Sequence, residues 1–293
     1  FHLVNLVLHG IVTFLVTEVS SLVLISDIMS QFITGCIFGL HPVHVEAVTN
    51  ITSRGELLMS VFFLLGVWSY VTHVDHHHYN NKHSRALYVY VIPWLCMTLS
   101  VFCKEQGATT LVTAVLLDFV AHHGSVYQFL QQLMQHRDPS AIEFLWRTSV
   151  LAIQSLIIVL GRYYLNGASS PDFIFDQNPA GFSTDRFTRT FSVAWVHCLY
   201  VFDMICPMYL APDWSGKSID LIETLHDVRV VGVVVLWTVV AVAVYSLLFG
   251  NAQSISRRVL LTAFWAFTFA PFLLSSNLLV TVGLMKADRV IYL

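Results

Sequence analysis

Residues 228–249 read VRVVGVVVLWTVVAVAVYSLLF, an apolar run with a single charge, Arg229. A helix needs about 20 mainly apolar residues to cross a hydrocarbon core of about 30 Å. In lipid, each backbone polar group must be bonded within the protein, which favours a helix for such a run. The run therefore predicts a transmembrane helix and places this fold in a membrane.

The composition of the whole chain supports the same prediction. Of the 293 residues, 56% are hydrophobic and only 11% are charged, far from the average soluble domain. The net charge of −3 excludes the one-sided basic surface of a dedicated nucleic-acid binder. The five cysteines form no CxxC pair and have no zinc-site spacing, so we expect them to pack between helices. Because the chain starts at Phe1 and stops at Leu293 within an apolar run, we expect a piece of a longer protein.

Further apolar segments recur along the chain. They cover residues 3–25, 28–40, 57–74, 87–103, 107–121, 146–165, 191–210 and 259–280. Several of them approach the length of a membrane span. The fold class predicted from this pattern is an all-α, polytopic membrane helix bundle.

Basic residues in short loops predict the orientation, because such loops tend to stay cytoplasmic. They are Lys82 and Arg85, Arg137 and Arg147, and Arg257 and Arg258. These three groups share one side only if one segment between Arg147 and Arg257 fails to cross. Residues 191–210 are the best candidate, because Asp203 lies in their middle and a carboxylate at the bilayer centre is costly. We predict a re-entrant or interfacial helix there.

This topology gathers many ionisable residues on the opposite, non-cytoplasmic face. They lie in residues 41–56, at Lys104-Glu105, and in residues 166–189 and 212–227. Charges beside apolar helices are costly unless they pair or bind something, which predicts a cavity at the membrane surface. For each residue taken alone, a helix cap or an interfacial salt bridge is the competing interpretation.

The segment His41-Pro42-Val43-His44-Val45-Glu46 ends one apolar run. In a helix, His41 and His44 would share a face. Two histidines and a glutamate allow a metal site, a phosphate site or a helix cap. No metal site is predicted, because Pro42 breaks the register and no third histidine or cysteine follows nearby.

Three other motifs are given ordinary interpretations. Asp75-His76-His77-His78 and His122-His123 are predicted to be solvated linkers. Asn50-Ile51-Thr52 is formally a glycosylation sequon, but it lies close to a predicted helix end.

A set of short motifs resembles one known family in order along the chain. They are Phe1-His2-Leu3-Val4-Asn5, Leu8-His9, residues 41–48, Ser53-Arg54-Gly55-Glu56-Leu57-Leu58, Cys103-Lys104-Glu105-Gln106-Gly107, Asp176-Gln177-Asn178-Pro179-Ala180, Arg189-Thr190, Pro212-Asp213-Trp214-Ser215, Ser276-Asn277-Leu278 and Asp288-Arg289-Val290-Ile291-Tyr292-Leu293. Together they resemble the transmembrane and tetratricopeptide-repeat-containing (TMTC) proteins. Gly55-Glu56 departs from that pattern, which is expected to have a small residue followed by aspartate.

The resemblance implies a type C glycosyltransferase-like fold in the endoplasmic-reticulum membrane. Family members transfer mannose from dolichyl phosphate mannose to Ser or Thr hydroxyls of folded secretory-pathway proteins, such as cadherin domains, and carry lumenal repeats. The resemblance divides this chain into N-terminal transmembrane helices (1–165), a lumenal loop with the next two helices (166–250), and a last helix with a lumenal segment (251–293). Residues from about Asp172 to the end of the helix over 228–249 resemble the family's domain of unknown function. The partners implied are membrane lipid, the dolichyl-linked donor and the acceptor proteins.

The resemblance also implies roles for individual residues, and it requires no metal or cofactor. Cationic groups would hold the departing phosphate, and carboxylates would bind sugar hydroxyls. The phosphate candidates are Arg54, Lys104, Arg189 and Arg289, the sugar candidates are Glu46, Glu56, Asp176 and Asp213 with Trp214 as a stacking face, and His41, His44 and Glu105 complete the set. The family's acidic catalytic loop would precede Phe1, so we expect this chain to be inactive alone.

Two other classes of function stay open. A non-catalytic membrane scaffold would use the same bundle to recruit partners. A transporter needs ionisable groups at the membrane midplane, for which Glu18 and Asp203 are the candidates, and no inverted repeat supports it.

Overall fold

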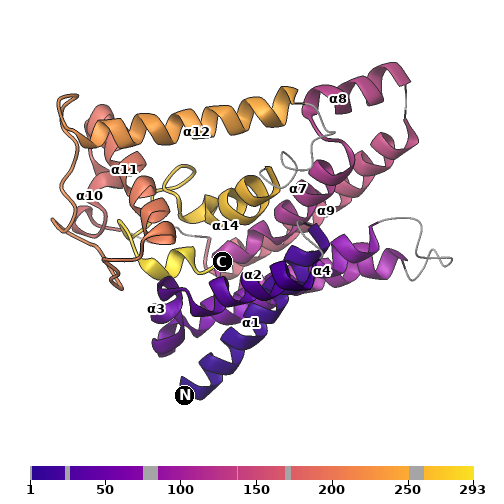
Figure 1. Ribbon diagram of the computed structural model, residues 1–293, viewed down its shortest axis with the longest axis horizontal. Coiled ribbons are helices and arrows are strands. Elements are labelled where there is room, and N and C mark those ends of the chain that lie inside the picture. Colours follow the sequence, from indigo (N-terminus) through magenta and orange to yellow (C-terminus); the bar gives the residue numbers. More distant parts are fainter. Residues whose placement is uncertain (1, 24–26, 75–84, 137, 169–172, 251–260) are drawn as a thin grey trace.

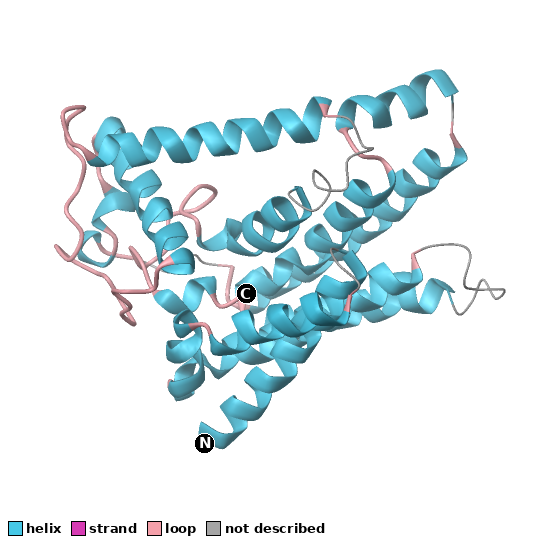
Figure 2. Cartoon of the chain, in the orientation of Figure 1, coloured by secondary structure: helices cyan, strands magenta, loops and turns pink. Residues whose placement is uncertain are grey.

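The computed structural model describes residues 2–23, 27–74, 85–136, 138–168, 173–250 and 261–293. The histidine tract at 76–78 and the basic residues Lys82, Arg137, Arg257 and Arg258 lie outside these ranges, so their predicted roles stay predictions. Within the described residues the secondary structure is helical throughout, apart from one isolated β-bridge between Trp214 and Lys286 (Figure 2). The all-α prediction is confirmed.

Every predicted apolar segment contains a helix in its described residues, although the segments 191–210 and 259–280 are helical only in part. The longer helices are α1 (His2–Val23), α2 (Ile28–Leu40), α4 (Arg54–His73), α6 (Ile92–Cys103), α7 (Thr110–His122), α9 (Pro139–Leu165), α11 (Arg186–Ile205) and α12 (Arg229–Phe249). Shorter helices join them: η1 (Pro42–His44), α3 (Val45–Thr49), η2 (Ile51–Ser53), η4 (Leu87–Val91), η5 (Glu105–Thr109), α8 (Val126–Gln131), η6 (Gln132–His136), η7 (Phe175–Gln177) and α10 (Pro179–Phe182). The last part of the chain contains η8 (Thr262–Phe269), α14 (Ala270–Phe272), η9 (Leu273–Ser275) and η10 (Asp288–Ile291).

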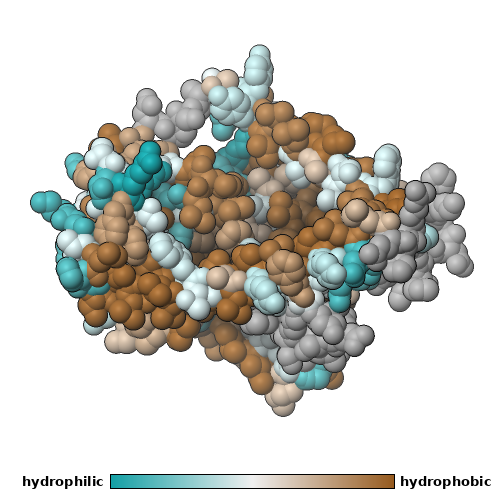
Figure 3. Space-filling model, turned by 90° about the horizontal axis from the view of Figure 1, so that it is seen from above, coloured by the Kyte–Doolittle hydropathy of each residue, from teal (hydrophilic) through white to brown (hydrophobic). Residues whose placement is uncertain are grey.

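Four of these helices are long and apolar enough to cross a membrane. They are α1, α9, α12 and the helix over Ile51–His73 that contains α4. A fifth span is possible if α2 is counted together with the bent segment Pro42–Thr49 that follows it. Much of the surface is hydrophobic (Figure 3), as expected for helices that face lipid.

The helix ends separate the predicted motifs from the predicted cytoplasmic loops. In Figure 1, α3, α10 and α11 lie at the left-hand end, which we call the motif end. The helix α8 and the described start of α9 lie at the right-hand end. Of the basic residues that the sequence assigned to the cytoplasmic side, the structure describes Arg85 and Arg147. Both pair with Glu143 near the start of α9, at the end opposite the motifs.

The helix α11 differs from its neighbours in direction and composition. It runs steeply down the motif end, whereas α12 crosses the view horizontally (Figure 1). It begins at Arg186, earlier than the apolar pattern predicted, because the carboxylate of Asp185 caps it by accepting a hydrogen bond from the Thr188 N–H at 2.7 Å. It is absent from the helices apolar enough to span a membrane. Its direction supports the predicted interfacial placement, which stays a prediction.

A buried polar network holds the other end of the bundle together. The carboxylate of Asp118 on α7 accepts hydrogen bonds from Arg147 at 2.9 Å and from the Tyr70 hydroxyl at 2.6 Å, and it lies 2.8 Å from His122 Nδ1. His123 is also buried, among Phe rings, and lies 3.1 Å from the Gln132 amide oxygen. The prediction of a solvated linker is therefore wrong for His123, which is the C-cap of α7 and fills the core. His122 is the last residue of α7 and is exposed, with its ring beside the Asp118 carboxylate.

Candidate functional site

The last stretch of the chain, residues 286–293, lies where the motifs converge, and we call it the C-terminal segment. Figure 1 shows it beside α3 and the ends of the bundle helices. Tyr292 is fully buried in the core formed by α1 and α4. Motifs separated by most of the sequence therefore contact one another around this segment.

Arg289 makes the ionic contact between the C-terminal segment and α3. Its backbone N–H donates to Glu46 Oε2 at 2.8 Å, and its Nη1 donates to Glu46 Oε1 at 2.7 Å and to the Pro212 carbonyl at 3.0 Å. The Arg289 side chain is 29% exposed and that of Glu46 is 9% exposed. The guanidinium is held in place while part of it still faces outward.

A second ion pair, between Lys104 and Glu56, lies beside the first. The Glu56 carboxylate is buried, and its Oε2 has no hydrogen-bond partner among the described residues. Burial lowers the pKa of Lys104 to about 8, and the nearby Arg289 cation acts in the same direction. Glu56, Gln106 and Arg289 line one small cavity together with Tyr292. Arg289 and Glu56 thus line the same small cavity, and each of them is paired with a further charged residue, Glu46 and Lys104 respectively.

Rings pack behind these ion pairs. Tyr292 Oη lies 2.7 Å from His9 Nδ1, and His9 Nε2 lies 3.1 Å from the Gly39 carbonyl. The ring of His44 lies 4.8 Å from that of Tyr292 and 4.3 Å from that of Phe38, measured between centroids. His44 Nδ1 is buried and has no partner among the described residues. His44 therefore packs within a ring cluster.

His41 does not share a helix face with His44. Its backbone is extended (φ −67°, ψ 127°), and its Nδ1 caps η1 by accepting from the Val43 N–H at 3.3 Å. The cause is Pro42, since a residue that precedes proline is disfavoured in helical geometry. The prediction of a shared helix face is wrong, and the capping alternative is the one observed.

Each of the remaining charged candidates at the bundle has a contact of its own. Arg54 Nε donates to Asn5 Oδ1 at 2.9 Å, which bridges the first motif to α4. Glu105 pairs with Arg162 and has 68% of its side chain exposed. Lys104 and Glu105 are neighbours in the sequence but have different partners, and they lie at the turn that joins α6 to η5 and α7.

Three further charged candidates take no part in the two ion pairs among the described residues. Arg189 Nη2 donates to Thr281 Oγ1 at 3.1 Å, and Asp176 and Asp213 are exposed. The fully buried Asn178 donates to Asn277 Oδ1 at 2.8 Å and to the Val282 carbonyl at 2.9 Å. This contact joins the 176–180 and 276–278 motifs but carries no charge.

Sequence reasoning missed a buried cluster centred on Lys286. Its Nζ lies 2.6 Å from Asp203 Oδ2, 3.0 Å from Asp288 Oδ1 and 4.9 Å from the centre of the Trp214 ring. Asp203 therefore faces protein rather than lipid. Trp214 has one face against an ammonium, which leaves only the other for a sugar. Lys286 could have been noticed as a lone cation next to an apolar stretch.

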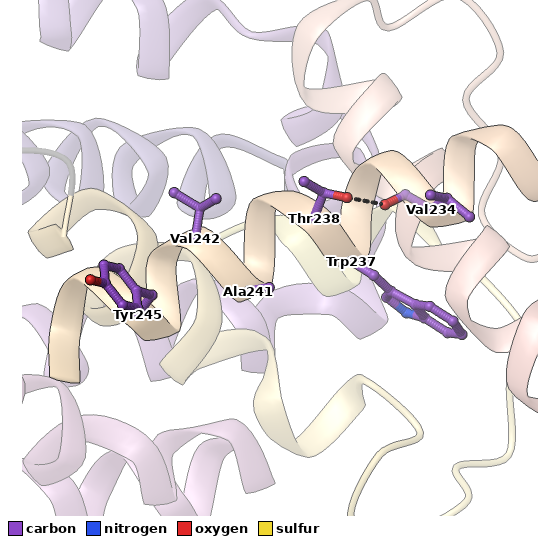
Figure 4. A pocket seen from close by; sticks show the side chains of 6 residues that line it. All are labelled: Val234, Trp237, Thr238, Ala241, Val242 and Tyr245. Carbon is purple, nitrogen blue, oxygen red and sulfur yellow. Dashed lines mark hydrogen bonds between the residues drawn. The ribbon is translucent and has the colours of Figure 1, made fainter. Parts of the chain in front are cut away.

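The groove along α12 has a different character. It is lined by Val234, Trp237, Thr238, Ala241, Val242 and Tyr245. Figure 4 shows these side chains leaving the helix in several directions, with the Thr238 hydroxyl bonded to the Val234 carbonyl of its own helix at 2.8 Å. No ionisable side chain reaches it apart from the tyrosine. It is a lipid-facing surface and offers nothing for polar chemistry.

Comparisons with known proteins agree with the motif pattern. The family model described as "Protein O-mannosyl-transferase TMTC, DUF1736" matches residues 167–241. Human Protein O-mannosyl-transferase TMTC4 is 29% identical over 315 residues, covering 100% of this chain and 42% of the relative. Human Protein O-mannosyl-transferase TMTC2 is 31% identical over 244 residues (81% and 28%), and Drosophila melanogaster Protein O-mannosyl-transferase Tmtc3 is 29% identical over 331 residues (100% and 35%). No solved structure matches significantly.

The fold and the ion pairs define the class first: an all-α membrane helix bundle with a charged cluster at one end. Within that class, the relatives and the family model confirm the resemblance to the TMTC family predicted from the motifs. The chain spans less than half the length of these relatives.

Proposed function

We propose that this chain is the membrane part of a protein O-mannosyltransferase of the endoplasmic reticulum. The donor is dolichyl phosphate mannose, and the acceptors are Ser or Thr hydroxyls of secretory-pathway proteins. The relatives' names support a sugar donor and a protein acceptor. The type C glycosyltransferase-like fold and the endoplasmic-reticulum location are parts of the same proposal.

The observation that carries the proposal is that Arg289 lines one cavity with Glu56, the ion-pair partner of Lys104, and that the Arg289 cation lies near enough to lower the pKa of Lys104. In the reaction an acceptor hydroxyl attacks the anomeric carbon and gives its proton to a carboxylate base, the bond from that carbon to the phosphate oxygen breaks, and dolichyl phosphate leaves. Cationic donors stabilise the charge that develops on the phosphate. Both cations are partly exposed at the motif end, where a lipid-linked phosphate at the membrane surface would meet them.

In this proposal the two carboxylates orient a cation and bind the sugar. Glu46 orients the Arg289 guanidinium through two hydrogen bonds. The unpartnered Oε2 of Glu56 offers an acceptor to a sugar hydroxyl. Arg189, Asp176 and Asp213 are not members of these two ion pairs, and we assign them no contact with the phosphate.

The test is mannose transfer from radiolabelled donor by the full-length protein in microsomes. Replacing a charge-assisted contact at Arg289 with Ala costs about 1.5–3 kcal/mol, which corresponds to roughly a tenfold to hundredfold loss of kcat/KM. The exposed Lys217 at the same end is the matched control, and Lys217→Ala leaves transfer unchanged. Insertion and expression of each variant are measured in parallel.

Transfer by the wild type that is lost only in Arg289→Ala supports the enzyme. No transfer to any of several acceptors favours the scaffold. Equal losses at Arg289 and Lys217 contradict the assigned site.

A further inference from the structure

Lys286 is a buried cation that the proposed reaction does not use. Its side chain is 3% exposed, and its carboxylate partners Asp203 and Asp288 are 5% and 2% exposed. Burying an ammonium is costly unless it is paired, and here two carboxylates and the face of Trp214 surround it. Such a cluster fixes positions closely, because any displacement separates buried charges.

The cluster joins the C-terminal segment to two other elements. Asp203 lies near the end of α11, so the ion pair links that helix to the start of the segment. The Trp214 N–H donates to the Lys286 carbonyl at 2.8 Å, and the Ala287 N–H donates to the Tyr200 hydroxyl at 3.0 Å. Side-chain and backbone contacts therefore anchor the same two residues of the segment.

The far end of the segment is anchored separately. Tyr292 Oη lies 2.7 Å from His9 Nδ1, and its ring is buried in the core. Between the two anchors lies only the short helix η10, which carries Arg289. Because both ends of the segment are anchored, the position of the Arg289 guanidinium depends on the positions of Lys286 and Tyr292.

We propose that Lys286 is a positioning residue for Arg289, and that its ion pair with Asp203 sets the place of the guanidinium at the donor phosphate. This inference rests on the proposed function. A displacement of about 1 Å in a positioned group can cost a hundredfold in rate, even when the mutated residue is remote from the chemistry. Lys286 itself touches no substrate in this scheme.

The test measures KM for dolichyl phosphate mannose and kcat for the full-length protein in microsomes. Lys286→Met raises the donor KM by about tenfold, because the phosphate of the bound donor is already anionic, and it also lowers kcat, because the leaving phosphate gains further charge in the transition state. Lys286→Arg recovers part of this loss, since it keeps the cation. On an Arg289→Ala background, Lys286→Met raises KM no further, because the residue through which it acts is gone.

A neutral triple variant guards against misfolding. Lys286→Met leaves two buried carboxylates without their cation, so the Asp203→Asn, Lys286→Met, Asp288→Asn protein removes all three charges of the cluster together. The inference predicts that this protein inserts normally and still shows the raised donor KM.

Two results overturn the inference. In the first, apparent kcat falls in proportion to the folded protein while KM stays constant, as a purely structural role requires. In the second, the KM effects at Lys286 and Arg289 multiply. Wild-type protein that transfers no mannose instead refutes the proposed function, and the positioning role with it.

Discussion

Replacing Asp118 with Ala is expected to destabilise the end of the bundle opposite the motif end. The Asp118 side chain is completely buried, and it accepts hydrogen bonds from Arg147 and Tyr70. The Arg147 side chain is only 8% exposed, so the substitution leaves a buried cation without its main partner. Removing one member of a buried pair costs about 3–5 kcal/mol.

The matched control is Glu105→Ala, which breaks an ion pair with Arg162. The Glu105 side chain is 68% exposed, and an exposed pair contributes only about 0–1 kcal/mol. In a chain of 293 residues each kcal/mol corresponds to about 2 °C in the unfolding midpoint. Asp118→Ala should therefore lower the midpoint by roughly 6–10 °C, and Glu105→Ala by about 2 °C or less.

The assay is thermal unfolding of the detergent-solubilised full-length protein, followed by loss of the monomeric peak in size-exclusion chromatography. Equal shifts for the two variants would refute the reasoning that burial determines the cost. A stable Asp118→Ala protein would show that water or detergent satisfies Arg147.

Three further predictions concern the motif end. Gly107→Ala should sharply reduce the yield of folded protein in a detergent expression screen, because the added Cβ would overlap the backbone of the preceding helix. Gly10→Ala should not reduce the yield, because the space around Gly10 is open. Equal yields of the two variants would contradict this prediction. The pKa of Lys104 is lowered to about 8, so this side chain loses its charge as the pH rises through 8. The donor KM of the wild type should therefore rise between pH 7 and pH 9, and that of Lys104→Arg should stay constant. A constant KM in the wild type would exclude Lys104 from the phosphate site. Tyr292→Phe should cost about 1–3 kcal/mol in thermal unfolding, because it leaves His9 Nδ1 buried without its partner, and an unchanged midpoint would show that the contact contributes nothing.

The fold could be predicted from the sequence because lipid imposes a simple rule. Apolar runs such as 228–249 must be helical, and their lengths fix most helix bounds. The start of α11 was missed because Arg186 and Arg189 are polar, although the Asp185 cap was a readable signal. The helix predicted over 259–280 stops at Ser275 in the described residues, and the chain beyond it turns back to place Asn277 against Asn178.

The sequence identified residues of the candidate site but not which of them contact one another. Arg54 and Glu56 are both candidates from the sequence, and in the structure their partners are Asn5 and Lys104 respectively. The partner of each residue is set by contacts between helices that are distant in the sequence. Local spacing of residues does not predict such contacts. The role of Lys286 went unnoticed for the same reason, since its partner Asp203 lies on another element.

The measurement that tests the central claim most directly is a structure of the full-length protein with bound dolichyl phosphate mannose. The account predicts the donor phosphate within hydrogen-bond distance of Lys104 and Arg289, with the Arg289–Glu46 contact intact. A phosphate bound elsewhere, beside Arg189 for example, with both cations still in their ion pairs and away from the ligand, would contradict it.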